Sequence, residues 1–308
     1  MLDADAHMKR LPLKVRKAIP VALVAVTAVL FAYLFAKHPE YRRTLASTNP
    51  WVLLLIGALY GVLILCFNWV YSITLRLCGE QLGGRENILL TCYSTIVNFF
   101  GPLQSGPGVR AAYVKQKRQV KIKDYTLATF VYYSMYAVVS ALFILMGSGR
   151  HWPLALGLVF AVSAGCGGIV YLAHKRIART GQKSAFRATP ALLGILLLAT
   201  ICQLSVVALI YYVELRAVHT GASLMQAIVY GGAANFSLFV SLTPGAIGFR
   251  EAFLEFSRQL HHIPTSGILA ASVIDRSVYV VFLGVLFLLT VGMHLGDRFS
   301  KAAKAAQE

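Results

Sequence analysis

Long apolar runs constrain the fold of this chain more than any other feature. Crossing a bilayer as an α-helix takes about 20 apolar residues, and six segments qualify, at residues 18–36, 51–75, 125–147, 152–173, 190–213 and 267–292. Charged residues make up only 13% of the chain, against about 25% in a typical soluble domain. The sequence therefore predicts an all-α polytopic membrane protein and argues against a soluble enzyme or a secreted disulfide scaffold.

Two further apolar segments are interrupted by Pro-Gly breaks. Residues 88–104 and 224–244 each run into such a break, and a short amphipathic piece follows each of them. Irregular backbone is tolerated at membrane depth only where protein or a water-filled cavity satisfies it, so a broken apolar helix that turns back indicates a re-entrant hairpin. Two full crossings are the alternative.

The distribution of basic residues favours the hairpins. With hairpins and a cytoplasmic N-terminus, 21 of the 29 lysines and arginines lie on the cytoplasmic side. With full crossings, the basic clusters at residues 110–123 and 175–187 would face outward, against the positive-inside rule. The same distribution explains the net charge of +17 by membrane orientation, so nucleic acid is not expected as a partner. Both termini are expected in the cytoplasm.

The two broken segments also indicate an internal repeat. Asn98-Phe-Phe and Asn235-Phe-Ser occupy equivalent places, and each is followed by a break, an arginine and a long apolar span. We expect a single membrane domain over residues 1–308, with a first half at 15–150, an inverted second half at 151–295 and a cytoplasmic tail at 296–308. The fold class is then six spans plus two re-entrant hairpins in an inverted repeat, which is typical of alternating-access transporters.

The motifs at the breaks resemble those of a known family. Asn98-Phe-Phe-Gly-Pro-Leu-Gln-Ser-Gly-Pro-Gly-Val-Arg110 and Thr243-Pro-Gly-Ala-Ile-Gly-Phe-Arg-Glu251 are similar to motifs in the membrane domain of lysylphosphatidylglycerol synthase/flippase proteins and their stand-alone, flippase-like relatives. The second motif is close to the family's P-G-G-x-G-x-R-E pattern, with Ala246 in place of one glycine. The first has Gln104 and Pro107 where the family has Arg and Glu, but Gly106 and Arg110 match.

The resemblance implies a function in moving lipids. Bifunctional members carry a soluble aminoacyl-transferase domain after the membrane part, whereas this chain ends at Glu308, so we expect no lipid aminoacylation and no enzyme activity. What remains is a flippase in a bacterial inner membrane for an anionic or amphiphilic lipid, such as a phosphatidylglycerol derivative or a polyprenyl phosphate. An ion-coupled carrier of a small anion, and an accessory factor or enzyme of lipid-linked sugar assembly, are the alternatives. A homo-oligomer is possible, and no cofactor or metal is expected.

Charged residues within the apolar segments are the strongest candidates for a site. Asp275 and Arg276 lie inside the last span, where ionisable side chains are costly and usually face a cavity or a partner. Adjacent helical residues point about 100° apart, so each needs a partner elsewhere. Arg250 and Glu251 at the second break are the natural partners, either as part of a lipid-binding gate or as a structural clip.

The two breaks are candidate headgroup sites. A helix that restarts after a Pro-Gly turn presents free N–H groups suited to phosphate, and Arg250 beside Gly245 would add a bidentate donor. The same argument applies to Gly106 and Arg110 at the first break. A plain tight turn is the alternative at both. Asn98 and Asn235 are candidates for hydrogen bonding either to hairpin backbone or to substrate.

Several other polar residues are expected to have ordinary structural roles. Glu214 is expected as an interfacial charge at the end of a span, and the pair His261-His262 as a surface pair. Gln203 suits a helix–helix hydrogen bond as well as a functional role. Tyr132, Tyr133 and Tyr136 are expected to pack or to lie at an interface, with cavity lining as the second possibility.

Overall fold

A computed structural model of the chain describes residues 39–100, 105–147, 185–238 and 249–305, with scattered residues between 152 and 175. All regular secondary structure in these ranges is helical. Four helices are long and apolar enough to cross a membrane: Pro50–Leu77, Ile122–Met146, Pro190–Ala217 and Thr265–Met293. They match four of the predicted spans. Residues 18–36 lie outside the described residues, and the segment 152–173 is described only at scattered positions.

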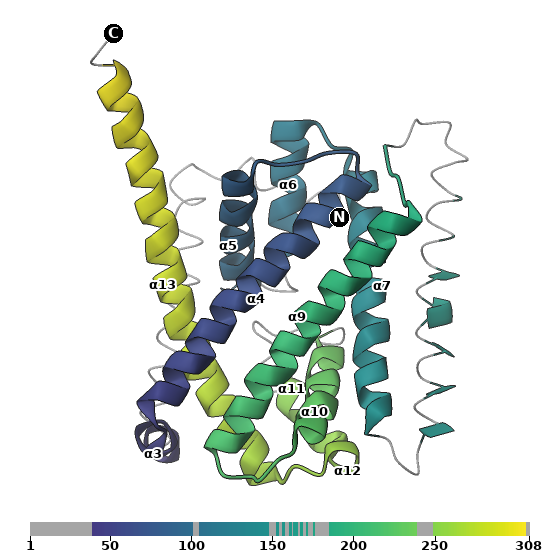
Figure 1. Cartoon of the computed structure of the whole chain (residues 1–308), viewed down its shortest axis with the longest axis vertical. Helices are drawn as coiled ribbons and strands as arrows, with labels where there is room; N and C mark the ends of the chain where they lie inside the picture. Colours follow the sequence, from purple (N-terminus) through teal and green to yellow (C-terminus); the bar gives the residue numbers. More distant parts are fainter. Residues whose placement is uncertain are drawn as a thin grey trace, which may run out of the picture.

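Two antiparallel helices of equal length form the centre of the molecule. Helix α4 (Pro50–Leu77) and helix α9 (Pro190–Ala217) each have 28 residues, and they pack against each other (Figure 1). Each begins at a proline, preceded by a side chain that caps the helix: Asn49 accepts a hydrogen bond from the N–H of Trp51, and Thr189 from that of Leu192. Proline suits the first helical position because its missing N–H would have no partner there.

The broken segments form two sets of shorter helices. After α4 come α5 (Gly84–Phe100) and α6 (Gly106–Arg118), which pack together, and α7 (Ile122–Met146) follows. After α9 come α10 (Leu224–Ser237), α11 (Phe249–Phe256) and α12 (Arg258–His261), and then α13 (Thr265–Ala305). The short helix α3 (Pro39–Ser47) precedes α4. Helices α5 and α6 lie towards one end of the molecule, and α10, α11 and α12 lie towards the other (Figure 1).

Hydrogen bonds fix which helix ends meet at the α5–α6 end. The N–H of Arg187, just before α9, donates to the carbonyl of Leu77 at the end of α4 over 2.7 Å. The N–H of Ala185 donates to Oδ2 of Asp124 in the first turn of α7 over 3.1 Å. The last turns of α13 extend beyond this same end (Figure 1). The segments that carry most of the described basic residues are thus gathered on one side.

The outer faces of the helices are apolar. Large side chains are exposed along α4 and α13, among them Trp51, Leu54, Leu65, Val281 and Leu288. Contiguous exposed apolar surface is rare on soluble monomers. A lipid environment satisfies such a surface, which agrees with a multi-pass membrane protein.

Candidate functional site

Helices α5 and α6, which flank the first break, pack closely where α6 begins. The N–H of Gly106, at the start of α6, donates to Oδ1 of Asn98 on α5 over 3.2 Å. A Cβ on Gly106 would lie 2.7 Å from the carbonyl oxygen of Ser94 and 3.0 Å from Oδ1 of Asn98. Glycine is therefore required for this approach of α6 to α5, and Asn98 bonds the hairpin backbone.

Arg110 lies one turn further along α6 and is buried, with 4% of its surface exposed. Its guanidinium carbon stands 3.3 Å from the centroid of the Tyr71 ring, and its Nε donates to the hydroxyl of Tyr125 over 3.1 Å. Its Nη1 is buried and makes no hydrogen bond. No carboxylate among the described residues forms an ion pair with Arg110, whose contacts are with the Tyr71 ring and the Tyr125 hydroxyl.

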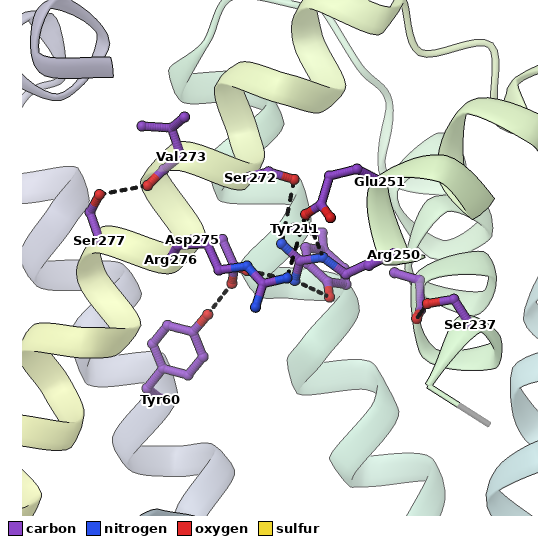
Figure 2. A network of polar contacts seen from close by, with 11 residues as sticks. Tyr60, Tyr211, Ser237, Arg250, Glu251, Ser272, Val273, Asp275, Arg276 and Ser277 are labelled. Atoms are coloured by element: carbon purple, nitrogen blue, oxygen red, sulfur yellow. Dashed lines mark hydrogen bonds and ion pairs between the residues drawn. The ribbon is translucent and has the colours of Figure 1, made fainter. Parts of the chain in front are cut away.

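The arginine after the second break is, in contrast, paired. Figure 2 shows Arg250 reaching from α11 to Asp275 on α13, with Nη1 2.5 Å from Oδ2 of Asp275. Its guanidinium also donates to the Tyr211 hydroxyl and to Oγ of Ser272, each over 3.4 Å, while Nε lies 3.5 Å from Oε1 of Glu251. The predicted partnership between the second break and the last span is present.

Arg276 and Tyr60 extend the contacts of Arg250 into one polar network. Arg276 places Nη2 3.4 Å from Oε1 of Glu251, and the hydroxyl of Tyr60 on α4 donates to Oδ1 of Asp275 (Figure 2). Adjacent residues Asp275 and Arg276 thus use partners on other helices, as helix geometry requires. The network links α4, α11 and α13, so it fastens the second break to the last long helix.

Of the two polar atoms in the side chain of Asn235, on α10, one has a hydrogen-bond partner and the other has none. Its Oδ1 accepts a hydrogen bond of 2.7 Å from the Tyr136 hydroxyl, which ties α10 to α7. Its Nδ2 is buried and has no hydrogen-bond acceptor. Buried amide groups are normally satisfied, so Asn235, like Arg110, holds an N–H donor without a partner.

A cavity of about 230 Å³ is lined by described residues that flank both breaks. Asn98, Gly106 and Arg110 line it from the first half, and Asn235, Arg250, Asp275 and Arg276 line it from the second. Glu251 contacts this lining through Arg250 and Arg276. Gly245 lies outside the described residues. Candidates 177 residues apart along the chain, from Asn98 to Asp275, therefore surround one space.

Aromatic residues make up much of the remaining wall. Seven tyrosines line the cavity, together with Gln203, which accepts a hydrogen bond of 3.0 Å from Tyr132: Tyr60, Tyr71, Tyr132, Tyr133, Tyr136, Tyr211 and Tyr279. Tyr132, Tyr133 and Tyr136 pack in or against the buried core, as expected, and they also line the cavity, which was the second possibility. The others lie within apolar spans, where a tyrosine resembles a packing residue.

Two sequence-based readings are wrong. Glu214 is not an interfacial charge, because the residue is fully buried, including both carboxylate oxygens. His261 is not on the surface: its Nδ1 accepts the N–H of Ile263, so Nε2 carries the proton and donates to the carbonyl of Leu254. The burial of a residue depends on how the helices pack around it, and the place of that residue in the sequence does not reveal this packing.

The apolar exterior, the spanning helices and the buried charged cavity define a multi-pass membrane protein with a polar site enclosed among its helices. Residues 18–287 match the family "Lysylphosphatidylglycerol synthase TM region". The match covers most of the chain, which therefore belongs to this family. Comparison with curated proteins gives no match.

Proposed function

We propose that this protein moves an anionic lipid between the leaflets of its membrane, with the headgroup passing through the cavity. Membership of the lysylphosphatidylglycerol synthase membrane-region family supports a lipid-related role. Phosphatidylglycerol and polyprenyl phosphates are the substrate class, because both present an anionic phosphate on an apolar anchor. We further propose that the polypeptide catalyses no covalent reaction.

The observation that carries the proposal is the unpaired charge of Arg110. A buried guanidinium without a carboxylate is costly, because desolvation is not offset by an opposite charge. The stacked Tyr71 ring offsets part of this cost. A phosphate oxygen would complete the site by pairing with the charge and accepting from the free Nη1. Asn235 would add a donor from the other half.

The cavity size supports a headgroup rather than a whole lipid as the occupant. Pockets for drug-sized ligands measure roughly 300–1,000 Å³, and this cavity, at about 230 Å³, is smaller. A phosphate with a short polar group fits such a volume. The acyl or isoprenoid chains would remain in the bilayer.

The arrangement of the helices supports alternating access between two inverted halves. The equal lengths and similar starts of α4 and α9, and their antiparallel packing, favour a repeat of opposite orientation. We infer that each break is a re-entrant hairpin and that the two enter from opposite faces. The basic end of the molecule would face the cytoplasm, and residues 18–36 and 152–173 would supply the two remaining spans. Rocking of one half against the other would then expose the headgroup to each leaflet in turn.

A panel of headgroups tests the proposal. The purified protein is reconstituted into vesicles with fluorescent phosphatidylglycerol, phosphatidylcholine or a labelled polyprenyl phosphate, and dithionite reports label reaching the outer leaflet. We expect faster loss of signal than in protein-free vesicles for one or both anionic lipids, and little change for the zwitterionic one. Rates equal to those of protein-free vesicles for every lipid would contradict the proposal.

Uptake of soluble glycerol phosphate by the same vesicles distinguishes the main alternative. A carrier for small anions would accumulate this probe without translocating any lipid. The proposed flippase would translocate lipid and would not accumulate glycerol phosphate, because its substrate must remain anchored in the bilayer.

A further inference from the structure

Thr95 on α5 is a buried polar residue that the proposed headgroup site leaves without a role. It is 5% exposed and lines the cavity, and its Oγ1 makes no hydrogen bond. A threonine hydroxyl inside a helix often donates to the backbone carbonyl four residues earlier, and four other threonines do so: Thr74, Thr91, Thr129 and Thr200. The hydroxyl of Thr95 is therefore free to bond a molecule in the cavity.

The buried polar atoms of the cavity wall that lack hydrogen bonds are mostly donors. Among the described lining residues they are Nη1 of Arg110, Nδ2 of Asn235, Nε of Arg250 and Oγ1 of Thr95. Nε of Arg250 already faces a carboxylate oxygen of Glu251 at 3.5 Å. The nitrogen atoms can only donate, whereas the threonine hydroxyl can donate or accept. A buried donor without an acceptor costs free energy, so the wall favours a ligand rich in oxygen acceptors.

The charges of the wall disfavour two other kinds of headgroup. Asp275 is the only carboxylate among the described residues that line the cavity, and it is paired with Arg250. An amine on the headgroup would therefore meet no unpaired carboxylate, and it would bring a positive charge near that of Arg110. Arg250 and Arg276 both contact carboxylates, so a second negative charge would find no further unpaired guanidinium. The wall favours one negative charge with an uncharged polar substituent.

A glycerol or sugar hydroxyl meets these requirements, since it accepts and donates hydrogen bonds and carries no charge. Its oxygen can accept from Nδ2 of Asn235 on α10 and exchange a hydrogen bond with Oγ1 of Thr95 on α5. The tyrosine rings of the wall would cover the C–H surface of such a group, because a tyrosine combines an apolar ring with a polar hydroxyl.

We propose that Thr95 is a specificity-determining residue that binds a headgroup hydroxyl, with Asn235 as the second partner, so that the cavity selects a glycerol or sugar phosphodiester. This inference rests on the proposed function, which places the phosphate at Arg110. It adds that the group beyond the phosphate is also recognised, and that a headgroup with an amine or a terminal phosphate is disfavoured.

Two soluble lipids that differ only in their headgroup hydroxyls test this inference. Dihexanoyl phosphatidylglycerol and dihexanoyl phosphatidylpropanol carry the same phosphodiester charge and the same three-carbon headgroup, but only the first has hydroxyls. Each is titrated into the purified protein in neutral detergent, and calorimetry gives its affinity. We expect the wild type to bind phosphatidylglycerol about tenfold more tightly, because one net hydrogen bond changes an affinity by up to about tenfold.

Thr95→Val removes the hydroxyl and nearly keeps the shape of the side chain. It should abolish most of this preference and leave the affinity for phosphatidylpropanol unchanged, which also shows that the variant is folded. Thr91→Val is the matched control, because Thr91 lies one turn earlier on α5, is buried, and is absent from the cavity lining. This control should keep the wild-type preference. Thr95→Ala, which also lacks the hydroxyl, replaces Thr95→Val if the latter does not fold.

The outcomes separate this inference from the proposed function. Equal affinities of the wild type for the two lipids would overturn hydroxyl recognition and leave translocation of an anionic lipid standing. A preference that persists unchanged in Thr95→Val would overturn the role of Thr95. Hydroxyl-dependent binding without lipid translocation in vesicles would retain the specificity role but reject the flippase. Absence of binding, or tighter binding of dihexanoyl phosphatidylethanolamine than of phosphatidylglycerol, would overturn both.

Discussion

At the scale of single residues, the two arginines that follow the breaks differ in their surroundings. Arg250 is held by a carboxylate at 2.5 Å, whereas Arg110 is held by a tyrosine ring and a hydroxyl. The sequence presents them as equivalent, since each follows a Pro-Gly break. Arg250 already belongs to an ion-pair network, whereas Arg110 pairs with no carboxylate among the described residues, which is why the proposed headgroup site centres on Arg110. Arg110 is therefore the residue on which substrate charge should depend.

His261 is the residue for which a pH effect is expected. Burial lowers its pKa, and the acceptor role of Nδ1 toward Ile263 requires a neutral ring. The unfolded chain then binds a proton at His261 more readily than the folded protein. Neutral His261 therefore contributes to folding stability above the ordinary histidine pKa, and this contribution is lost as pH falls through the lowered pKa of the folded protein. We expect the midpoint of thermal unfolding in detergent to fall on acidification from pH 7.5 to pH 5.5. The loss of stability should match the titration of one group, at most about 1.4 kcal/mol for each unit by which its pKa is lowered.

A pair of variants isolates this effect. His261→Gln should lower stability at neutral pH by about 1–3 kcal/mol, as expected when a buried hydrogen-bond partner is lost, and should flatten the pH dependence. His262→Asn changes the exposed neighbour, whose φ of 56° asparagine tolerates, and should leave the pH profile unchanged. An equally steep profile in His261→Gln would assign the effect to another group.

At the scale of elements, the packing of α6 against α5 depends on two kinds of contact. Gly106 allows the start of α6 to approach α5, and Glu86 at the outer end accepts hydrogen bonds from Tyr113 and Arg118 of α6 over 2.7 and 2.6 Å. Partial burial opposes ionisation of Glu86, but these hydrogen bonds hold the net pKa of its carboxyl below the ordinary value. Contacts thus join α6 to α5 at both ends of α6, and Arg110 lies between them.

Substitution of the two glycines of α6 tests this packing. Gly106→Ala would force its Cβ against the Ser94 carbonyl, so we expect a loss of about 1–3 kcal/mol, typical of overpacking. Gly108→Ala has open space around the new Cβ and should be neutral or stabilising by up to about 1 kcal/mol. Chemical unfolding in detergent compares the two, and equal stability of both variants would show that α6 does not approach α5 as described.

The elements also show which features a sequence reveals. Asp275, Arg276 and Arg250 stand out because charges are rare among apolar residues, and the Pro-Gly breaks separate α5 from α6 and α10 from α11. Tyr60, Tyr71, Tyr211 and Tyr279 do not stand out, because a tyrosine has the same sequence appearance in a wall, in a core or on a lipid-facing surface. Glu214 was misread because its position near a helix end does not show that α10, α11 and α13 surround it.

At the scale of the whole molecule, the central proposal is an inverted pair of halves. The prediction is that residues in α6 and in α12 face opposite sides of the membrane. In a background without native cysteines, Lys117→Cys and Gln259→Cys place exposed thiols at these sites. An impermeant maleimide added to intact cells should label only the second, and both after permeabilisation. Labelling of both in intact cells would contradict the inverted arrangement.

The charge of Arg110 offers the most direct test of the account as a whole. Labelled phosphatidylglycerol is followed across vesicles that contain the wild type, Arg110→Ala or Lys115→Ala, the last removing an exposed positive charge from the same helix. Loss of a charged hydrogen bond of about 1.5–3 kcal/mol predicts a roughly tenfold or larger drop in rate for Arg110→Ala and little change for Lys115→Ala. Equal rates in wild type and Arg110→Ala, with both proteins folded, would contradict passage of the headgroup through this cavity.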